Sequence, residues 1–189
     1  MTKYLGDPQY QTSWKLFAQQ STREKTQMKP ISYVDELNKH YGSMGFPPYE
    51  WTINKSAPLT RIDKPISECT VSLLTSGGVS QCSMPDFDPN ARNDHRLDEV
   101  PKDANSADFN INDSYYDHTD ADIDLNCVFP IDRLGELEKN GEIGGTAKRF
   151  WSGFMGRIYN RSKVLNESAP AFVEKLKEDG VDILIAAPA

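Results

Sequence analysis

The chain contains 189 residues, with 28 acidic and 21 basic side chains, and its net charge is −7. This length suffices for one domain with a substantial core, or for one domain with an N-terminal extension, but not for two full domains. The acidic balance argues against nucleic acid or an anionic membrane as the main partner. No segment approaches about 18 apolar residues, and the N-terminus lacks the apolar centre of a signal peptide. We therefore expect a cytoplasmic protein that binds neither nucleic acid nor membrane.

Residues 1–66 are polar and rich in proline, and their helical spacing is confined to two short pieces. The apolar positions of these pieces are Trp14, Phe17 and Ala18 in the first and Val34, Leu37 and Tyr41 in the second. The pattern predicts an N-terminal arm of two helices and a loop. This arm is expected either to pack on a core that residues 67–189 supply or to contact a partner.

A β-rich run from Thr70 to Thr75 leads into three small residues, Ser76, Gly77 and Gly78. A strand that ends in glycines lets the backbone approach a ligand closely. The letters match neither the dinucleotide fingerprint nor the phosphate-binding loop of nucleotide-binding proteins. A turn that requires positive φ explains the glycines equally well.

The middle of the chain is polar and then strongly acidic. Residues 84–108 predict a long surface loop with room for a short strand, in which His95 is expected to be solvated. In residues 108–124, aspartates gather around His118, and no lysine or arginine lies between Lys102 and Arg133. Such a run needs water, a cation, helix N-termini or basic residues from elsewhere in the fold.

A metal site is one interpretation of the acidic run, because Asp120, Asp122 and Asp124 have the opening spacing of an EF-hand loop. That loop needs glycine where this chain has Leu125, and it needs a bidentate glutamate where this chain has Ile131. The single histidine adds little to a transition-metal site. We therefore predict no metal.

The cysteines, three in number, are Cys69, Cys82 and Cys127. Their odd number and wide spacing predict neither a disulfide framework nor a zinc site, which agrees with a reducing compartment. Cys82 falls in a polar stretch where a thiol is open to reaction. Cys127 lies between Asn126 and the apolar letters VFP, which favours a small buried hydrophobic residue.

Helix and strand signals alternate from residue 130 onward. Pro130 and Gly141 delimit a predicted helix. Residues 148–160 predict a short strand that leads into a loop bearing Gly153 and Gly156. Ser168 is expected to begin a second helix, which ends at Gly180. The inward-facing positions of that second helix are predicted to be Ala169, Phe172, Val173 and Leu176.

The last nine letters, VDILIAAPA, form an apolar run typical of a buried parallel strand. Strand, helix, strand, helix, strand predicts an α/β fold with a parallel, flavodoxin- or Rossmann-like, three-layer sheet. The glycine-bearing loops at residues 76–78 and 153–156 then follow strands and share one edge of the sheet. The sheet is expected to be incomplete at the C-terminus.

The letters SLLTSGGV, SYYDHTDADIDLNCVFPIDRLGELEKNGEIG, FMG and ESAPAFVEKLKEDGVDILIAAPA, in this order, resemble the selenoprotein B family of glycine, sarcosine, betaine and D-proline reductases. The resemblance covers about residues 68–189, and DLNCVFPID is similar to a stretch of the D-proline enzyme. The N-terminal arm does not share in it. Residues SYYDHTD depart from the D-proline enzyme, which puts D-proline itself in doubt as the substrate.

The resemblance implies an oxidoreductase subunit that cleaves a C–N bond of a small amino-acid-like or betaine-like molecule. In the family, the strand that corresponds to VDILIAAPA runs into a redox segment with selenocysteine or cysteine, so the nucleophile is expected after Ala189 and not within this chain. Selenocysteine is encoded by UGA, and we therefore expect the chain to be the N-terminal part of a longer selenoprotein; an engineered deletion is the competing explanation. A sheet cut there would expose the apolar surface of its last strand.

The resemblance also implies site residues, cofactors and partners. His118 is expected to donate a proton to the leaving amine, or else to neutralise a neighbouring aspartate. No cofactor is expected in this chain; a pyruvoyl group is expected on a partner subunit, and a thioredoxin-like or dithiol reductant is expected to supply electrons. Substrate or partner contacts are expected from Ser76, Gly77, Gly78, Tyr116, Asp117, Asp120, Phe154, Met155 and Gly156.

Two other functions stay open from the sequence. The first is a non-catalytic α/β module that binds a small ligand or docks a partner subunit through its loops, with the acidic segment facing a basic surface. The second is a metal hydrolase built on the acidic loop, which lacks a full ligand set.

Overall fold

The computed structural model describes residues 33–48, 55–56 and 60–188. The predicted helical piece around Trp14 lies outside the described residues. So does Ala189, after which the nucleophile was expected, and that expectation therefore stays a prediction. Within the described ranges, no helix combines the length and the apolar character that crossing a bilayer requires.

The chain divides into two compact units, and the first, residues 1–58, contains helix α2 (Tyr33–Ser43). This helix confirms the predicted helical piece with Val34, Leu37 and Tyr41. Acidic residues in its first turn and a histidine in its last turn suit the helix dipole. Val34 and Tyr41 are exposed, whereas Leu37 of the same stripe is half-buried.

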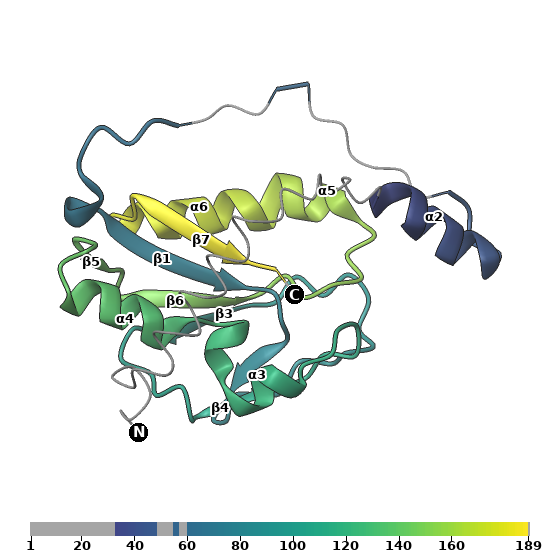
Figure 1. Cartoon of the computed structure of the whole chain (residues 1–189). Helices are drawn as coiled ribbons and strands as arrows, with labels where there is room; N and C mark the ends of the chain where they lie inside the picture. Colours follow the sequence, from purple (N-terminus) through teal and green to yellow (C-terminus); the bar gives the residue numbers. More distant parts are fainter. Residues whose placement is uncertain (1–32, 49–54, 57–59, 189) are drawn as a thin grey trace, which may run out of the picture. The chain divides into compact units, whose positions relative to one another are not determined.

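The second unit, residues 59–189, is built on a five-stranded, mostly parallel sheet. Strands β3, β6, β1 and β7 lie side by side in that order, and β5 pairs with the start of β1. All of them run parallel except β3, which is antiparallel to β6 and is the short strand anticipated within residues 84–108. The strands are β1 (Thr70–Thr75), β3 (Leu97–Pro101), β5 (Gly145–Thr146), β6 (Arg149–Gly153) and β7 (Ile183–Ala187) (Figure 1).

Two crossover helices cover opposite faces of this sheet, as predicted for a three-layer fold. They are α4 (Ile131–Lys139) and α6 (Ala169–Glu178) (Figure 1). Neighbouring residues of a strand point to opposite faces. Phe150 accordingly lies 6.4 Å from Phe129 on the α4 face, whereas Trp151 lies 5.0 Å from Phe172 of α6, between ring centroids.

The hydrophobic core lies mainly on the α4 face. It takes alternate residues of β1 together with the apolar stripe of α4, which is why the 3.6-residue spacing after Pro130 was informative. Its buried members are Val71, Leu73, Val79, Val100, Leu125, Phe129, Ile131, Leu134, Ile143 and Phe150. This core holds the carboxyl end of β1 in a fixed position beneath the loop that follows it.

A second, two-stranded sheet lies beside the main one and carries the acidic segment. It pairs β2 (Val79–Gln81) with β4 (Phe109–Ile111) in antiparallel register. The chain then forms the short helix α3 (Thr119–Ile123) and the 3₁₀ turn Leu125–Cys127. Leu125 is buried in the core and anchors this turn.

The last helical region begins earlier than predicted. Asn160 caps it, accepting a hydrogen bond from Ser162 N at 3.2 Å, and helical turns run from Arg161 through a π-type stretch into α6. Helix α6 itself begins directly after Ser168, as predicted, but Ser168 has helical backbone angles and makes no capping bond, because helical turns already precede it. Pro170 lacks an N–H, and a single π-type turn before it accommodates that loss.

Strand β7 is parallel to β1, as predicted, but it is an edge strand and not a buried one. Leu184 and Ile185 are 37% and 39% exposed. Val173, predicted to face inward, is 43% exposed, which corrects that prediction. The reason is that β7 pairs only with β1 among the described strands, so no further strand or helix covers this side. The expected apolar surface on the last strand is confirmed.

An ion-pair network ties β6, β3 and α6 together near the end of α6. Arg149 donates to Asp179 from Nε at 2.6 Å and from Nη2 at 3.0 Å, and it donates to Glu99 at 2.7 Å. The Asp179 side chain is fully buried. Burial alone raises the pKa of Asp179, but hydrogen bonds and charges from Arg149 and Lys148 outweigh this effect and hold the pKa below its usual value.

We predict that Arg149→Met lowers the free energy of unfolding by about 3 kcal/mol, because it leaves a buried carboxylate without its main partner. Urea denaturation followed by circular dichroism measures the change. Arg133→Met is the matched control, since Arg133 forms an exposed pair with Glu136 and contributes about 0.5 kcal/mol or less.

The same network sets a pH dependence. Because the folded pKa of Asp179 is depressed, its stabilisation is present above the unfolded pKa of about 4 and is lost as pH falls through the folded pKa. The difference between wild type and Arg149→Met should therefore shrink at acidic pH. A difference that is the same at neutral pH and in strong acid would contradict this account.

Candidate functional site

The carboxyl ends of β1, β6 and β7 meet at one edge of the sheet, because the three strands are parallel. Ser76 N, just beyond β1, donates to Ala187 O at the end of β7 over 3.3 Å. Ligands in open α/β sheets bind beyond this edge. The predicted sharing of one edge by the two glycine-bearing loops is confirmed.

The loop after β1 is held by its own backbone and by Tyr116. Gly77 N donates to Thr75 Oγ1 at 3.2 Å, and Tyr116 Oη donates to Gly77 O at 2.9 Å. Gly78 has φ of +66°, and a Cβ there would lie 2.4 Å from Asn112 O. The explanation by positive φ is therefore confirmed for Gly78, which also lets the backbone of Asn112 approach closely. Close approach of a ligand to these glycines stays a prediction.

His118 is connected to this loop by Tyr116, which contacts the His118 ring and donates a hydrogen bond to Gly77. The two rings are 5.8 Å apart in an edge-to-face arrangement. His118 Nδ1 is 2.8 Å from Asp122 Oδ2, one helical turn along α3. A carboxylate at Nδ1 fixes the imidazole's orientation and leaves Nε2 as the atom available to a ligand.

Tyr116 is a hydrogen-bond donor and not a base at neutral pH. Burial, with the charges of Asp113 and Asp122, raises the pKa of Tyr116 to about 12. The phenol therefore keeps its proton and its bond to Gly77 O. It joins the acidic segment to the loop after β1.

The side chains of Asp117 and Asp120 differ from Tyr116 and His118 in their contacts. Asp117 Oδ1 accepts bonds from Thr119 N at 3.1 Å and from Thr119 Oγ1 at 2.6 Å, which hold its pKa below the usual range. Asp120 is exposed on α3. The carboxylate of Asp124 likewise accepts from Asn126 N at 3.0 Å. Much of the acidic run thus satisfies backbone N–H groups at the starts of short helical turns.

The loop after β6 contributes Met155 to the site. Met155 is buried, and its Sδ would lie 3.1 Å from a Cβ at Gly78, so the two predicted glycine-bearing loops touch. Phe154 turns away toward α6 and packs against Phe172 at 6.2 Å between ring centroids. Gly156 is exposed with open space around it.

Two predictions about reactive side chains were wrong. Cys127 is exposed, because it ends a 3₁₀ turn whose buried position is Leu125; its Sγ lies 3.8 Å from Asp120 O. His95 is half-buried, and its Nδ1 is buried without a hydrogen-bond partner. Cys82 is exposed, as its polar surroundings indicated.

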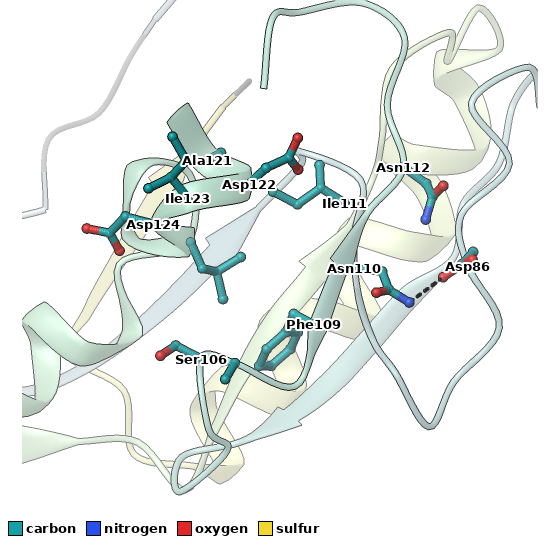
Figure 2. A pocket seen from close by; sticks show the side chains of 12 residues that line it. Asp86, Ser106, Phe109, Asn110, Ile111, Asn112, Ala121, Asp122, Ile123 and Asp124 are labelled. Atoms are coloured by element: carbon teal, nitrogen blue, oxygen red, sulfur yellow. Dashed lines mark hydrogen bonds between the residues drawn. The ribbon is translucent and has the colours of Figure 1, made fainter. Parts of the chain in front are cut away.

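A cavity of about 580 Å³ lies between β4 and α3, and the sequence did not reveal it. Figure 2 shows Asn110 bonded to Asp86 on one side of the cavity and the residues of α3 on the other. Asp122 both lines the cavity and contacts His118, so the cavity adjoins the site at the sheet edge. The lining residues are Asp86, Ser106, Ala107, Phe109, Asn110, Ile111, Asn112, Ala121, Asp122, Ile123, Asp124 and Leu125.

The described residues contain no group of three or more histidine, cysteine, aspartate or glutamate side chains arranged to hold a metal ion. The residue of the site that sequence reasoning missed is Asp122, which bonds to His118. The i, i+4 spacing of His118 and Asp122 was a usable signal for it, once α3 is a helix.

Curated relatives are subunits of reductase complexes. The chain is 34% identical over 139 residues to the D-proline reductase subunit gamma of Acetoanaerobium sticklandii, covering 74% of this chain and 53% of the relative. It is 30% identical over 153 residues to the sarcosine reductase complex component B subunit beta of Peptoclostridium acidaminophilum, covering 79% of this chain and 34% of the relative.

A third relative is the glycine reductase complex component B subunit gamma of Carboxydothermus hydrogenoformans, 29% identical over 65% of this chain and 28% of the relative. The chain thus spans about half the length, or less, of these relatives. No solved structure matches the chain. The family model for glycine/sarcosine/betaine reductase selenoprotein B matches residues 48–188. The chain belongs to the glycine/sarcosine/betaine reductase selenoprotein B family.

Proposed function

We propose that this chain forms part of a reductase subunit that uses a selenol or thiol to cleave the C–N bond of a small amino-acid-like or betaine-like molecule. The observation that carries the proposal is the meeting of the loops after β1 and β6 with the Tyr116–His118 pair at the carboxyl edge of the sheet. Family membership supports the reaction class, and the relatives belong to multi-subunit reductases.

The end of β7 is the proposed place from which the nucleophile is presented. This end lies beside Ser76. An exposed edge with Leu184 and Ile185 is what a strand shows when it requires a further neighbour. We propose that the nucleophile, a selenocysteine or cysteine side chain, follows Ala189 in the active subunit. Only the ionised form of such a group is a good nucleophile.

In the proposed reaction, a carbon–selenium or carbon–sulfur bond forms as the carbon–nitrogen bond breaks. An uncharged substrate amine leaves with a proton from His118, whose Nδ1 is held by Asp122, whereas a quaternary ammonium group leaves as the neutral amine without one. A thiol then attacks the selenium or sulfur: an Se–S or S–S bond forms as the bond to carbon breaks, and the carbon takes up a proton as the reduced product. A thioredoxin-like or dithiol reductant supplies the two electrons that open the Se–S or S–S bond. A pyruvoyl group on a partner subunit is the proposed activator of the substrate amine.

The test is amine release by the protein isolated with its natural partner subunits. Glycine, sarcosine, betaine and D-proline are supplied separately with dithiothreitol. The product of C–N cleavage is quantified by mass spectrometry: released ammonia or amine for the three open-chain compounds, and ring-opened 5-aminopentanoate for D-proline. We expect cleavage of at least one of the four, dependent on the dithiol. If the intact complex cleaves the C–N bond of no α-amino or α-ammonio acid, the proposed reaction is wrong.

A second candidate function is a non-catalytic binding or assembly module. The cavity of about 580 Å³ between β4 and α3, with three aspartates in its lining, favours it, because such a cavity suits a cationic ligand or a basic side chain. A complex that binds a ligand there and releases no amine would support the module over the reductase.

A further inference from the structure

The loop after β6 carries an unusual backbone. Phe154 and Arg157 have φ of +52° and +61°, in the left-handed region that side-chain-bearing residues seldom adopt. Each such residue is conformationally unfavourable, and such conformations gather at ligand-binding and catalytic sites. Two backbone hydrogen bonds hold the loop after β6 in this conformation: Asn93 N donates to Arg157 O at 3.0 Å, and Phe154 N donates to Arg96 O at 3.1 Å.

The Arg157 side chain is incompletely satisfied. Its Nη1 donates to Asn90 O at 3.1 Å, and its guanidinium lies 5.7 Å from the centroid of the Tyr115 ring. Its Nε is buried and has no hydrogen-bond partner. A buried donor on a cation is costly to leave unpaired, so a partner that the protein itself does not provide is expected there.

The other half-buried arginines of the described chain show the contrast. Arg96 pairs with Asp98, and Arg149 pairs with Asp179 and Glu99. None of the ion pairs among the described residues involves Arg157, although Arg157 lies close to an acidic segment. The chain thus keeps a partly desolvated guanidinium free of carboxylates at the carboxyl edge of the sheet.

We propose that Arg157 binds the carboxylate of the substrate; this inference rests on the proposed function. Guanidinium and carboxylate form paired, charge-assisted hydrogen bonds, which an amine without a carboxylate cannot make. Consecutive tyrosines connect the two ends of the site, since Tyr115 contacts Arg157 and Tyr116 contacts His118.

The experiment compares ligands with and without the carboxylate. Binding of D-proline against pyrrolidine, and of betaine against tetramethylammonium, is measured by calorimetry on the full chain and on Arg157→Gln. We expect Arg157→Gln to weaken the binding of D-proline and betaine about 10- to 100-fold and to leave the binding of pyrrolidine and tetramethylammonium unchanged. Arg161→Gln, an exposed arginine of the neighbouring helical turn, is the matched control and should bind as wild type does.

A measurement on the wild-type chain keeps the test free of folding effects. The ¹⁵N resonance of Arg157 Nε should shift when D-proline is added, whereas that of Arg149 Nε, already bonded to Asp179, should not. A merely structural role of Arg157, holding Asn90 in place, predicts no such shift.

The outcomes are separable. Equal binding of carboxylates by wild type and Arg157→Gln overturns the role of Arg157 and leaves the proposed function standing. Inorganic phosphate that competes as well as D-proline also overturns it, because the site would then accept any anion. A wild-type chain that binds neither the carboxylates nor their carboxylate-free analogues overturns this inference, whereas the proposed function is decided by C–N cleavage in the assembled complex.

Discussion

Amine release is expected to fall about 100-fold or more when His118 is replaced by glutamine in the assembled reductase. Glutamine fills a similar volume and keeps a hydrogen-bonding group near Asp122, but it cannot deliver a proton to the leaving amine. The measurement is the initial rate of amine release at saturating substrate. We expect substrate affinity to change little, because the lost contact is made mainly as the C–N bond breaks.

Two further variants make the His118 result specific. Asp122→Asn removes the charge at Nδ1 and should lower the rate by less than His118→Gln does, since the imidazole itself remains. Asp108→Asn changes an exposed aspartate of the same acidic segment and should leave the rate as it is. If His118→Gln keeps the full rate, another group donates the proton and the assignment of His118 is wrong.

Gly78→Ala is expected to destabilise the fold by about 3 kcal/mol, the second large effect. The new Cβ would lie 2.4 Å from Asn112 O, a backbone atom that cannot move without breaking the β2–β4 pairing. Positive φ adds about 1 kcal/mol to this cost. Urea denaturation gives the loss of stability, and the amide resonances of Gly77 and Tyr116 report whether the loop after β1 has shifted.

Gly180→Ala separates the two contributions. Gly180 has φ of +65°, nearly the same as Gly78, but nothing lies within 4 Å of a Cβ there. It should therefore cost only the conformational part, about 1 kcal/mol. If Gly78→Ala costs no more than Gly180→Ala, the close approach of Gly78 to the Asn112 backbone is not a constraint on the fold.

The parts of the fold that local spacing determines were predictable. Helix α4 follows from Pro130, Gly141 and an apolar stripe between them, and β1 follows from a run of β-branched and aliphatic residues. Alternation of strands and helices predicted a parallel sheet, and a parallel sheet places its loops at one edge. Residues 76–78 and 153–156 were accordingly expected to share one edge, and they do; their contact through Gly78 and Met155 was not predicted.

The errors concern burial and long-range partners. Val173 has the correct helical spacing to face inward, yet it is exposed because nothing among the described residues covers the β7 side of the sheet. Cys127 sits beside apolar letters, but a 3₁₀ turn directs Leu125 inward in its place. The antiparallel pairing of β3 with β6 and the half-burial of Arg157 depend on contacts between segments about 50 or more residues apart, which no local pattern encodes.

The most direct test of the central claim is a map of amide chemical-shift changes in the ¹⁵N-labelled chain as D-proline or betaine is added. Binding at the carboxyl edge of the sheet predicts changes at residues 76–78, 116–118 and 154–157, with little change at Asn110 and Ile123. Changes confined to Asn110, Ile123 and the rest of the cavity between β4 and α3 would contradict the claim and place the ligand elsewhere.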